Sequence, residues 1–189
     1  MSLDGPDDLH ATIIAFIGAA KERLDVAVQE LDSREIAKAL IAARMRKVRV
    51  RLILEGDYLW DEGGSADPWA PATKGQEENR TILAALLRAG IDVISDLNPK
   101  IFHQKFAVRD PEGPRAAVLT GSTNFTLTDT GANTAGTGVV GNNLNHLLIL
   151  HGKTAAGLYQ AEFDRLRSGT FGAMHERVEP RPTEFGLGG

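Results

Sequence analysis

A histidine and a lysine two positions apart, His103 and Lys105, are the residues of this sequence best placed to carry out chemistry. They lie in the run IFHQKFAVR, residues 101–109, whose pattern is typical of a strand. Alternate side chains of a strand share a face, so we expect an imidazole and an ammonium side by side, while Phe102 and Phe106 face the core. Such a pair predicts a site where a histidine attacks or transfers a proton beside a cation that neutralises an anion.

A second polar cluster, made of Gly121, Ser122 and Asn124, ends the apolar run AAVLTGSTN. The intervening DPEGP is typical of a turn, so residues 116–122 are expected to pair with residues 101–109 as a hairpin. That pairing would bring a hydroxyl, a carboxamide and a glycine suited to close approach toward the imidazole and the ammonium. These groups together suit an anionic tetrahedral ligand, and the sequence therefore predicts a phosphate site.

These residues have a fixed spacing, His103-x-Lys105-x4-Asp110 and then Gly121-Ser122-x-Asn124. The pattern resembles the HKD motif of the phospholipase D superfamily, and the chain looks like the short bacterial endonucleases of that family. The resemblance implies that His103 attacks phosphorus to give a covalent phosphohistidine, while Lys105 and Asn124 bind the phosphate and Ser122 supports them. It also implies a hydrolase that needs no metal ion and no other cofactor.

Asp110 is part of the motif and is counted with the catalytic candidates. Its strand parity is opposite to that of His103, and it begins the turn. We therefore expect Asp110 to anchor the hairpin and not to contact the substrate directly.

Two more positions are candidates for substrate binding. Trp60 lies in a long irregular segment from Asp57 to Lys74 and could stack on a base, line a lipid entrance or pin its own loop. Asn145 matches an Asn-x-Glu-Asn segment that the short nucleases of the family carry.

Leu144 stands where that segment has its acidic residue. A carboxylate that orients the histidine must then come from elsewhere, and Glu30 and Glu55 on neighbouring strands are the candidates.

The chain contains one copy of the motif, whereas the resemblance implies that a second histidine protonates the leaving oxygen. The family's short members solve this as homodimers, with two copies of His103 facing each other, and we expect the same here. The alternative is a second HKD half in a longer chain.

The elements that must position these residues alternate between helical and strand patterns. Helical periodicity covers residues 7–24, 33–47, 76–90 and 154–169, and strand patterns cover residues 24–31, 48–56, 91–96, 101–109, 116–122 and 146–151. This order predicts an α/β fold with a mixed, largely parallel sheet flanked by helices on both faces, as in one HKD half of the phospholipase D fold. We expect a single domain over residues 1–177 and a linker-like tail over residues 178–189.

Composition restricts the class of function. With 189 residues, a net charge of −4 and no cysteine, the chain is typical of a globular protein without disulfides or thiolate metal ligands, and it does not coat nucleic acid through bulk positive charge. The apolar run ATIIAFIGAA is too short to span a bilayer, which favours a cytoplasmic protein with no integral membrane segment.

The sequence therefore predicts a metal-independent phosphodiesterase that is active as a homodimer and cleaves DNA or RNA. Two alternatives stay open: a phospholipase D acting on phospholipid headgroups, and a noncatalytic phosphate-binding or dimerisation module of a larger protein.

Overall fold

A six-stranded mixed sheet forms the centre of the molecule, with strand order β3-β2-β1-β4-β5-β6. The computed structural model describes residues 7–59, 77–96, 100–132 and 143–171. The strands are β1 (Arg23–Val28), β2 (Arg49–Leu54), β3 (Asp92–Ser95), β4 (Lys105–Arg109), β5 (Ala117–Gly121) and β6 (Leu147–His151). Trp60 and the tail from residue 178 lie outside the described residues.

Four α-helices and one 3-10 turn connect and cover these strands. They are α1 (Leu9–Gly18), α2 (Arg34–Met45), η1 (Asp57–Leu59), α3 (Glu77–Arg88) and α4 (Lys153–Arg167). Ser33 caps α2 by accepting from the Ile36 N–H, as its place before the helical pattern predicts. Asp8 does the same for α1, accepting from the Ala11 N–H.

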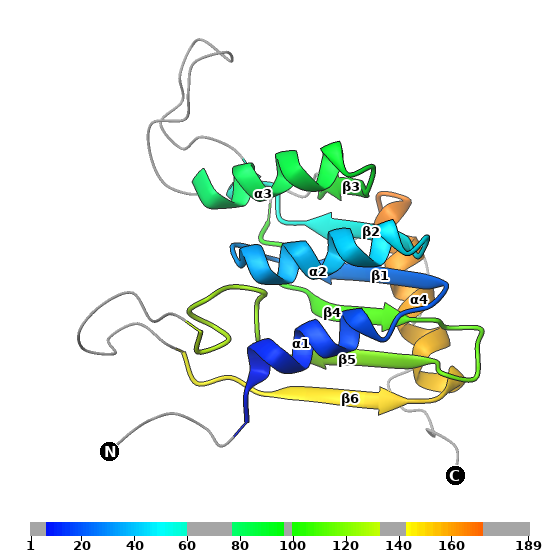
Figure 1. Ribbon diagram of the computed structural model, residues 1–189. Helices are drawn as coiled ribbons and strands as arrows, with labels where there is room; N and C mark the ends of the chain where they lie inside the picture. The colour runs from blue at the N-terminus through cyan, green and yellow to red at the C-terminus, as the bar shows by residue number, and fades with distance from the viewer. Residues whose placement is uncertain (1–6, 60–76, 97–99, 133–142, 172–189) are drawn as a thin grey trace.

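The helices lie in two layers, one on each face of the sheet. Helices α1, α2 and α3 cover the face turned toward the viewer, and α4 lies behind it (Figure 1). Each layer encloses its own core: Ala107 of β4 packs with α1 and α2, while Phe106 and Val108 pack with Phe163 of α4. This division confirms the strand parity expected for the segment that carries the motif.

The pairing within the sheet corrects one expectation. Parallel pairing is confined to β1, β2 and β3, whereas β1–β4, β4–β5 and β5–β6 are antiparallel, so the sheet is mixed but not largely parallel. The hairpin of β4 and β5 is confirmed, and it opposes Phe106 to Thr120. Its first strand begins at Lys105, so His103 precedes the ladder.

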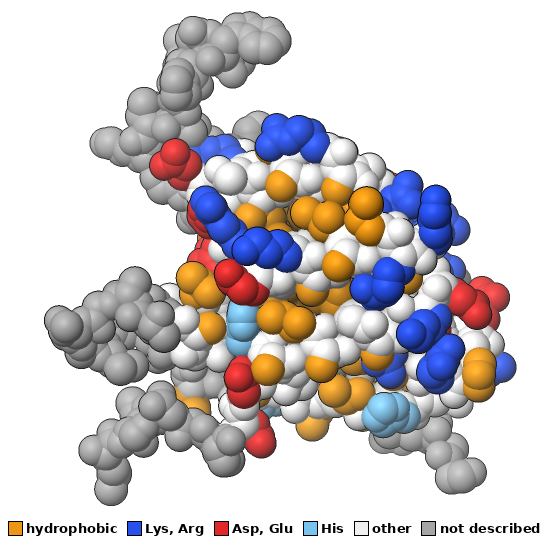
Figure 2. Space-filling view, viewed as in Figure 1, with side chains coloured by type: hydrophobic (Ala, Val, Ile, Leu, Met, Phe, Trp, Pro, Cys, Tyr) orange, Lys and Arg blue, Asp and Glu red, His pale blue; other side chains and the backbone are white. Residues whose placement is uncertain are grey.

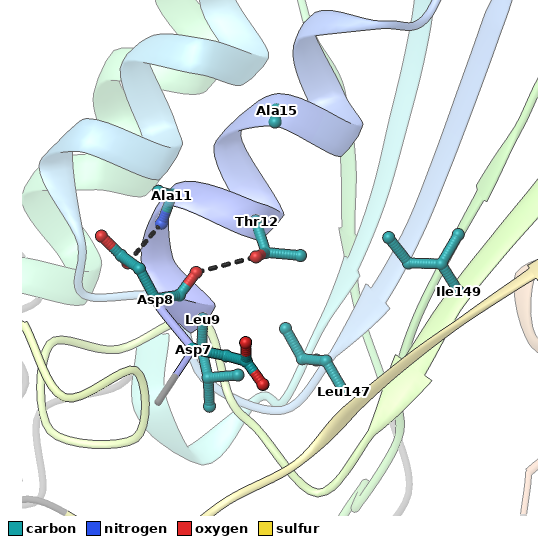
Figure 3. Close-up of a pocket in the computed structure, with 8 residues that line it drawn as sticks. All are labelled: Asp7, Asp8, Leu9, Ala11, Thr12, Ala15, Leu147 and Ile149. Atoms are coloured by element: carbon teal, nitrogen blue, oxygen red, sulfur yellow. Dashed lines mark hydrogen bonds between the residues drawn. The ribbon is translucent and has the colours of Figure 1, made fainter. Parts of the chain in front are cut away.

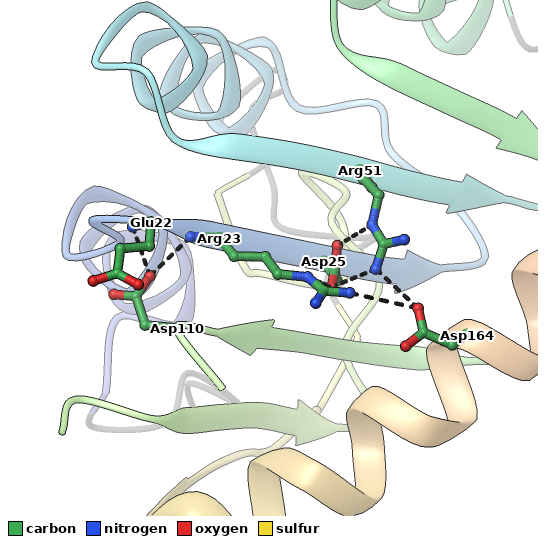
Figure 4. A network of polar contacts seen from close by, with 6 residues as sticks. All are labelled: Glu22, Arg23, Asp25, Arg51, Asp110 and Asp164. Atoms are coloured by element: carbon green, nitrogen blue, oxygen red, sulfur yellow. Dashed lines mark hydrogen bonds and ion pairs between the residues drawn. The ribbon is translucent and has the colours of Figure 1, made fainter. Parts of the chain in front are cut away.

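An ion-pair network built on the buried Asp25 and Arg51 attaches α4 to the sheet. The carboxylate of Asp25 receives a two-pronged bond from Arg51 at 2.6 and 2.9 Å, and Arg51 also reaches Asp164 of α4 at 3.0 Å (Figure 4). Arg23 adds a contact to Asp25 at 2.7 Å. Because every member has a partner, the network fixes the angle of α4 at the end of the sheet away from the motif.

The opposite end of the sheet is where the motif lies. Strands β1, β2, β3 and β5 end there, while β4 and β6 begin there (Figure 1). Within the described ranges, no helix is long and apolar enough to cross a membrane.

Candidate active site

Lys105 is a buried charged group of the motif. Its side chain is only 9% exposed, and its ammonium donates to Oε1 of Gln29 at 2.9 Å. Burial lowers the pKa of Lys105, and the charges of Asp129 and Glu30 partly oppose that shift. The lysine is therefore a buried cation that would gain from an anionic ligand.

Gln29 links Lys105 to the neighbouring 3-10 turn. It lies directly after the end of β1, is buried, and donates through Nε2 to the hydroxyl of Tyr58 at 3.0 Å. Because both ends of its amide are engaged, Gln29 fixes the direction in which the Lys105 ammonium points. No sequence pattern marks Gln29 or Tyr58, since Gln29 lies 76 residues from Lys105 along the chain.

Asn124 lies at the same end of the sheet, on the segment after β5. Its Oδ1 accepts from the Glu30 N–H at 3.3 Å, and its own N–H donates to Asp129 at 2.9 Å. The Asn124 side chain is thereby oriented with its oxygen toward the backbone, and its amino group is the part that can meet a ligand. The structure thus brings Lys105 and Asn124 to one place, as expected from the hairpin.

Acidic side chains surround these two groups. Burial, followed by the charge of Asp32, raises the pKa of Glu30; burial is also the main cause that raises the pKa of Asp32 itself. Asp129 is buried and also holds Asn143 through a hydrogen bond to the Asn143 side-chain amide. The site therefore sets a lysine and an asparagine among carboxyl groups, an arrangement that the motif alone does not predict.

Ser122 has different neighbours from those expected. Its hydroxyl donates to Oδ1 of Asn145 at 2.7 Å and lies 3.2 Å from Nδ1 of His146. Asn145 in turn donates to the carbonyl of Asp129 at 3.0 Å. Ser122 and Asn145 are thus linked to Asp129, and His146, the residue before β6, contacts a motif residue.

Gly121 is required by close packing between β5 and β6. A Cβ at this position would lie 2.1 Å from the carbonyl oxygen of His146, a distance that no side chain can occupy. The glycine therefore lets β6 approach closely enough for Ser122 to meet His146. The close approach that Gly121 permits is thus to the backbone before β6, and its expected contact with substrate stays a prediction.

His103 is exposed and has no hydrogen-bond partner among the described residues. Its chain neighbour Phe102 is buried, and the ring of Phe102 meets Phe171 edge-on at 6.1 Å. The N–H of Phe102 donates to the carboxylate of Glu55. The imidazole therefore projects from an anchored backbone and can meet a ligand.

Glu55 and Asp96 are two buried carboxyl groups at the ends of β2 and β3. Glu55 also accepts from the Asp57 N–H at 3.3 Å, and Asp96 accepts from the Gly56 N–H at 2.8 Å. Burial, with a further contribution from Asp96, raises the pKa of Glu55. Glu55 thus contacts the backbone beside His103, whereas Glu30, the other expected acid, lies beside Lys105 and Asn124. Leu144 is 78% exposed and takes no part in this contact.

Asp110 lies at the far end of β4, across the sheet from the site. Its carboxylate accepts from the N–H of Lys21 at 3.0 Å. It also accepts from the N–H groups of Glu22 and Arg23, at 2.8 and 2.9 Å (Figure 4). Asp110 therefore anchors the turn between α1 and β1 to the hairpin, which agrees with the role expected from its parity and corrects its place among the catalytic candidates.

The basic cluster RMRKVRVR, residues 44–51, lies at that same far end. Lys and Arg side chains gather where α1, α2 and α3 end (Figure 2). Arg44 donates to the carbonyl of Gly90 at 3.0 Å and Arg46 to that of Gly18 at 3.1 Å. These cations satisfy the carbonyl ends of neighbouring helices, so they do not form part of the site.

A groove of about 600 Å³ runs between the first turns of α1 and strand β6 (Figure 3). Asp7 and Asp8 line it at the start of α1, and Leu147 and Ile149 of β6 line it as well. Its lining contains none of the motif residues, so the groove is separate from the candidate site.

The chemistry available at the site depends on these positions. The exposed imidazole of His103, the buried ammonium of Lys105 and the oriented carboxamide of Asn124 lie at the same end of the sheet. The imidazole can act as a nucleophile, the ammonium can neutralise an oxyanion, and the carboxamide can donate a hydrogen bond to it. Among the described residues, no group of three His, Asp or Glu side chains could hold a metal ion.

Comparisons with known proteins agree with this description. The family profile described as "Cardiolipin synthase, PLD-like domain" matches residues 13–167. The mitochondrial cardiolipin hydrolase of Xenopus laevis is 28% identical over 160 residues, and that of Homo sapiens is 28% identical over 148 residues. The alignments cover 85% and 78% of this chain but only 61% and 46% of those relatives, so the chain spans part of their length.

Two solved structures share the fold. Nuc from Salmonella typhimurium, a phospholipase D family member, superposes with a TM-score of 0.62 at 21% identity, covering 84% of this chain and 86% of Nuc. NucT from Helicobacter pylori gives a TM-score of 0.62 at 19% identity, covering 86% of this chain and 89% of NucT.

Proposed function

This chain belongs to the PLD-like domain family of the phospholipase D superfamily, and on that basis we propose that it is a phosphodiesterase that works through a phosphohistidine on His103. The observation that carries the proposal is that the exposed His103 lies two residues before the buried cation Lys105, at the end of the sheet where Asn124 also lies. The exposed imidazole attacks phosphorus, and one oxygen of the former diester leaves. Water then attacks the phosphorus and breaks the bond to His103, releasing a phosphomonoester.

Lys105 and Asn124 stabilise the charge on the nonbridging oxygens during both steps. A buried ammonium interacts strongly with a developing oxyanion because little water screens the pair. Gln29 keeps the ammonium in place, and Asp129 keeps Asn124 in place through its N–H. The leaving oxygen still needs a proton donor.

We assign that donor to His103 of a second copy of this chain, which gives its proton to the leaving oxygen and then takes one from the attacking water, so the active species is a homodimer. The strand β6 supports this assignment, because it forms the edge of the described sheet, begins directly after His146, and carries Leu148 at 55% exposure with Ile149 also exposed. An apolar edge strand next to an incomplete site is a suitable surface for a second copy.

We propose nucleic acid as the substrate, with binding confined to the local cations of the site. A phospholipid is the second candidate, supported by two exposed apolar side chains at the motif end of the sheet: Ile101, two residues before His103, and Leu144, beside Asn145. The named activity of the Xenopus and human relatives points the same way.

The proposal is tested by incubation in EDTA with single-stranded DNA, RNA and cardiolipin vesicles, with product analysis at the end. Cleavage of one substrate by the wild type and loss of cleavage in His103→Ala support it, and the substrate that is cleaved decides between the two candidates. Protein quenched with detergent at alkaline pH, where a phosphohistidine is stable, should carry label from a phosphorus-labelled substrate on His103. Turnover without any labelled protein, or equal turnover by His103→Ala, would rule the mechanism out.

A further inference from the structure

The backbone that carries His103 is held from one side by two buried carboxyl groups. Glu55 is 2% exposed and Asp96 is 3% exposed, and each comes directly after the end of a strand. Two acids buried next to each other are costly, so their position requires a compensating set of contacts. Those contacts include backbone N–H groups, Phe102 and Asp57 for Glu55 and Gly56 for Asp96, and the two side chains also share a hydrogen bond.

The contact with Phe102 matters most because Phe102 directly precedes His103 in the chain. His103 comes before the first ladder residue of β4 and has no side-chain partner among the described residues. Its position therefore depends on its neighbours: Gln104, whose carbonyl accepts from the Gln29 N–H at 2.9 Å, and Phe102, whose N–H donates to Glu55. Glu55 thus acts one peptide away from the imidazole.

We propose that Glu55 is the positioning residue for the His103 nucleophile, acting through the N–H of Phe102, with Asp96 holding the loop on which Glu55 stands. The catalytic consequence of this role rests on the proposed function, whereas the position of His103 can be measured whether or not that function is correct. Asp96 contributes by accepting from Gly56, so that Glu55 cannot turn away from Phe102. Burial, followed by the neighbouring Asp96, raises the pKa of Glu55.

A carboxamide keeps the acceptor that this role needs, and an alkyl group does not. Glu55→Gln should therefore preserve the bond to Phe102, whereas Glu55→Leu leaves the N–H unpaired and Glu55→Asp is too short to reach both of its backbone partners. An error of about 1 Å in the position of a nucleophile can reduce the rate about 100-fold. We expect the rate of phosphohistidine formation to fall about 100-fold in Glu55→Leu and about 10-fold in Glu55→Asp, with KM nearly unchanged.

The direct test is the ¹H–¹³C NMR signal of the His103 ring in the protein without substrate, assigned by comparison with His103→Asn. Glu55→Leu and Glu55→Asp should shift or broaden this signal, and Glu55→Gln should leave it near the wild-type position. The signals of His10 and His151, which lie away from Glu55, serve as internal references. Ile17→Val, a small change in the core under α1, controls for general loss of stability.

Two results would overturn the proposal. One is an unchanged His103 signal in both Glu55→Leu and Glu55→Asp. The other is a Glu55→Gln protein whose His103 signal moves as far as that of Glu55→Asp, which would mean that charge and not the acceptor is what matters. If Glu55→Leu fails to fold, the comparison of the Asp and Gln variants decides. A wild type that is inactive on every phosphodiester, but whose His103 signal responds in the expected way, would refute the proposed function and leave the positioning role standing.

Discussion

The ammonium of Lys105 and the side-chain oxygen of Gln29 lie 2.9 Å apart, and both side chains are buried. The glutamine cannot rotate freely, because its amino group is engaged by Tyr58 at 3.0 Å. The phosphate-binding cation is therefore directed before any ligand arrives, by a residue outside the motif.

Replacement of Gln29 by leucine should weaken substrate binding more than it slows chemistry. The ammonium loses its acceptor, and a charge-assisted bond is worth about 1.5–3 kcal/mol, so we expect KM to rise about 10-fold or more with kcat reduced less. Steady-state kinetics on the substrate that the wild type cleaves measures this. Gln104→Leu is the matched control, since the Gln104 side chain has no hydrogen bond among the described residues. Equal effects of the two changes would contradict the assignment.

Lys105 should lower the stability of the fold that it serves. Its pKa in the folded state is below the ordinary 10.5, mainly through burial, so the unfolded chain binds its proton more readily. The free energy of unfolding therefore rises with pH between the folded pKa of Lys105 and 10.5. Above pH 10.5 the lysine is neutral in both states and no longer destabilises the fold, and this relief is lost as pH falls through the folded pKa.

We accordingly expect Lys105→Met to be inactive and, at pH 7, more stable than the wild type by about 0.5–2 kcal/mol. Urea unfolding at pH 7 and pH 10 should show this difference shrinking at the higher pH. Inorganic phosphate should raise the melting temperature of the wild type but not of the variant. A Lys105→Met variant less stable than the wild type at pH 7 would contradict this prediction, because it would show that the contacts of Lys105 stabilise the fold by more than the burial of its charge destabilises it.

Glu30 gives the opposite dependence on pH. Its folded pKa is raised from 4.5, by burial first and then by Asp32, so the folded state binds more protons above pH 4.5. The stability that this group contributes is present below pH 4.5 and is lost as pH rises through the folded pKa.

Glu30→Gln should therefore stabilise the protein at pH 7.5 by about 0.5–2 kcal/mol and have little effect at pH 4.5. Urea titrations at the two pH values measure the difference. Glu112→Gln, at an exposed position in the hairpin turn, should change stability at neither pH. A Glu30→Gln protein that is equally stabilised at both pH values would contradict the linkage.

The sequence alone predicts which face of the sheet each motif residue lies on, but not where the strand begins. Alternation places Lys105 and Phe106 on opposite faces because the period of a strand is a local property of the backbone. The residue at which strand pairing begins depends on the neighbouring strands and not on the local sequence. His103, which the sequence predicts within the strand, therefore lies before the first paired residue, Lys105. The register of the sheet and the approach of β1 decide that boundary.

Residues that support the site are harder to find in the sequence than the motif itself. Gln29 and Asp129 have no spacing that connects them to Lys105, since only the folded sheet brings the ends of β1 and β5 together. Glu55 is a candidate from the sequence because it ends a strand that precedes the motif strand in the expected order. Its actual contact, with the backbone of Phe102, is visible only in the folded chain.

Gly121 and Gly157 offer a matched pair of alanine substitutions with opposite expected signs. At Gly121 the new Cβ would lie 2.1 Å from the backbone before β6, so the strands must separate, at a cost of about 1–3 kcal/mol or more. At Gly157, within α4, no atom lies within 4 Å, and alanine should stabilise the helix by about 0.5–1 kcal/mol. Thermal unfolding of both variants checks the pair, and a tolerated Gly121→Ala would show that β6 does not pack closely against β5.

Asp110 has a structural role within the motif, in contrast to His103 and Lys105, which are proposed to carry out the chemistry. Its carboxylate receives three backbone N–H groups from the turn between α1 and β1, at the end of the sheet away from Lys105. Asparagine retains one acceptor oxygen but loses the charge and the second oxygen, so Asp110→Asn should destabilise the protein by about 1–3 kcal/mol. Its kcat and KM, measured well below the melting temperature, should stay within about twofold of the wild type, because a stability loss at a distant site leaves the folded fraction near one. Urea unfolding and kinetics on the same preparation test both halves, and a large fall in kcat without a loss of stability would place Asp110 in the chemistry after all.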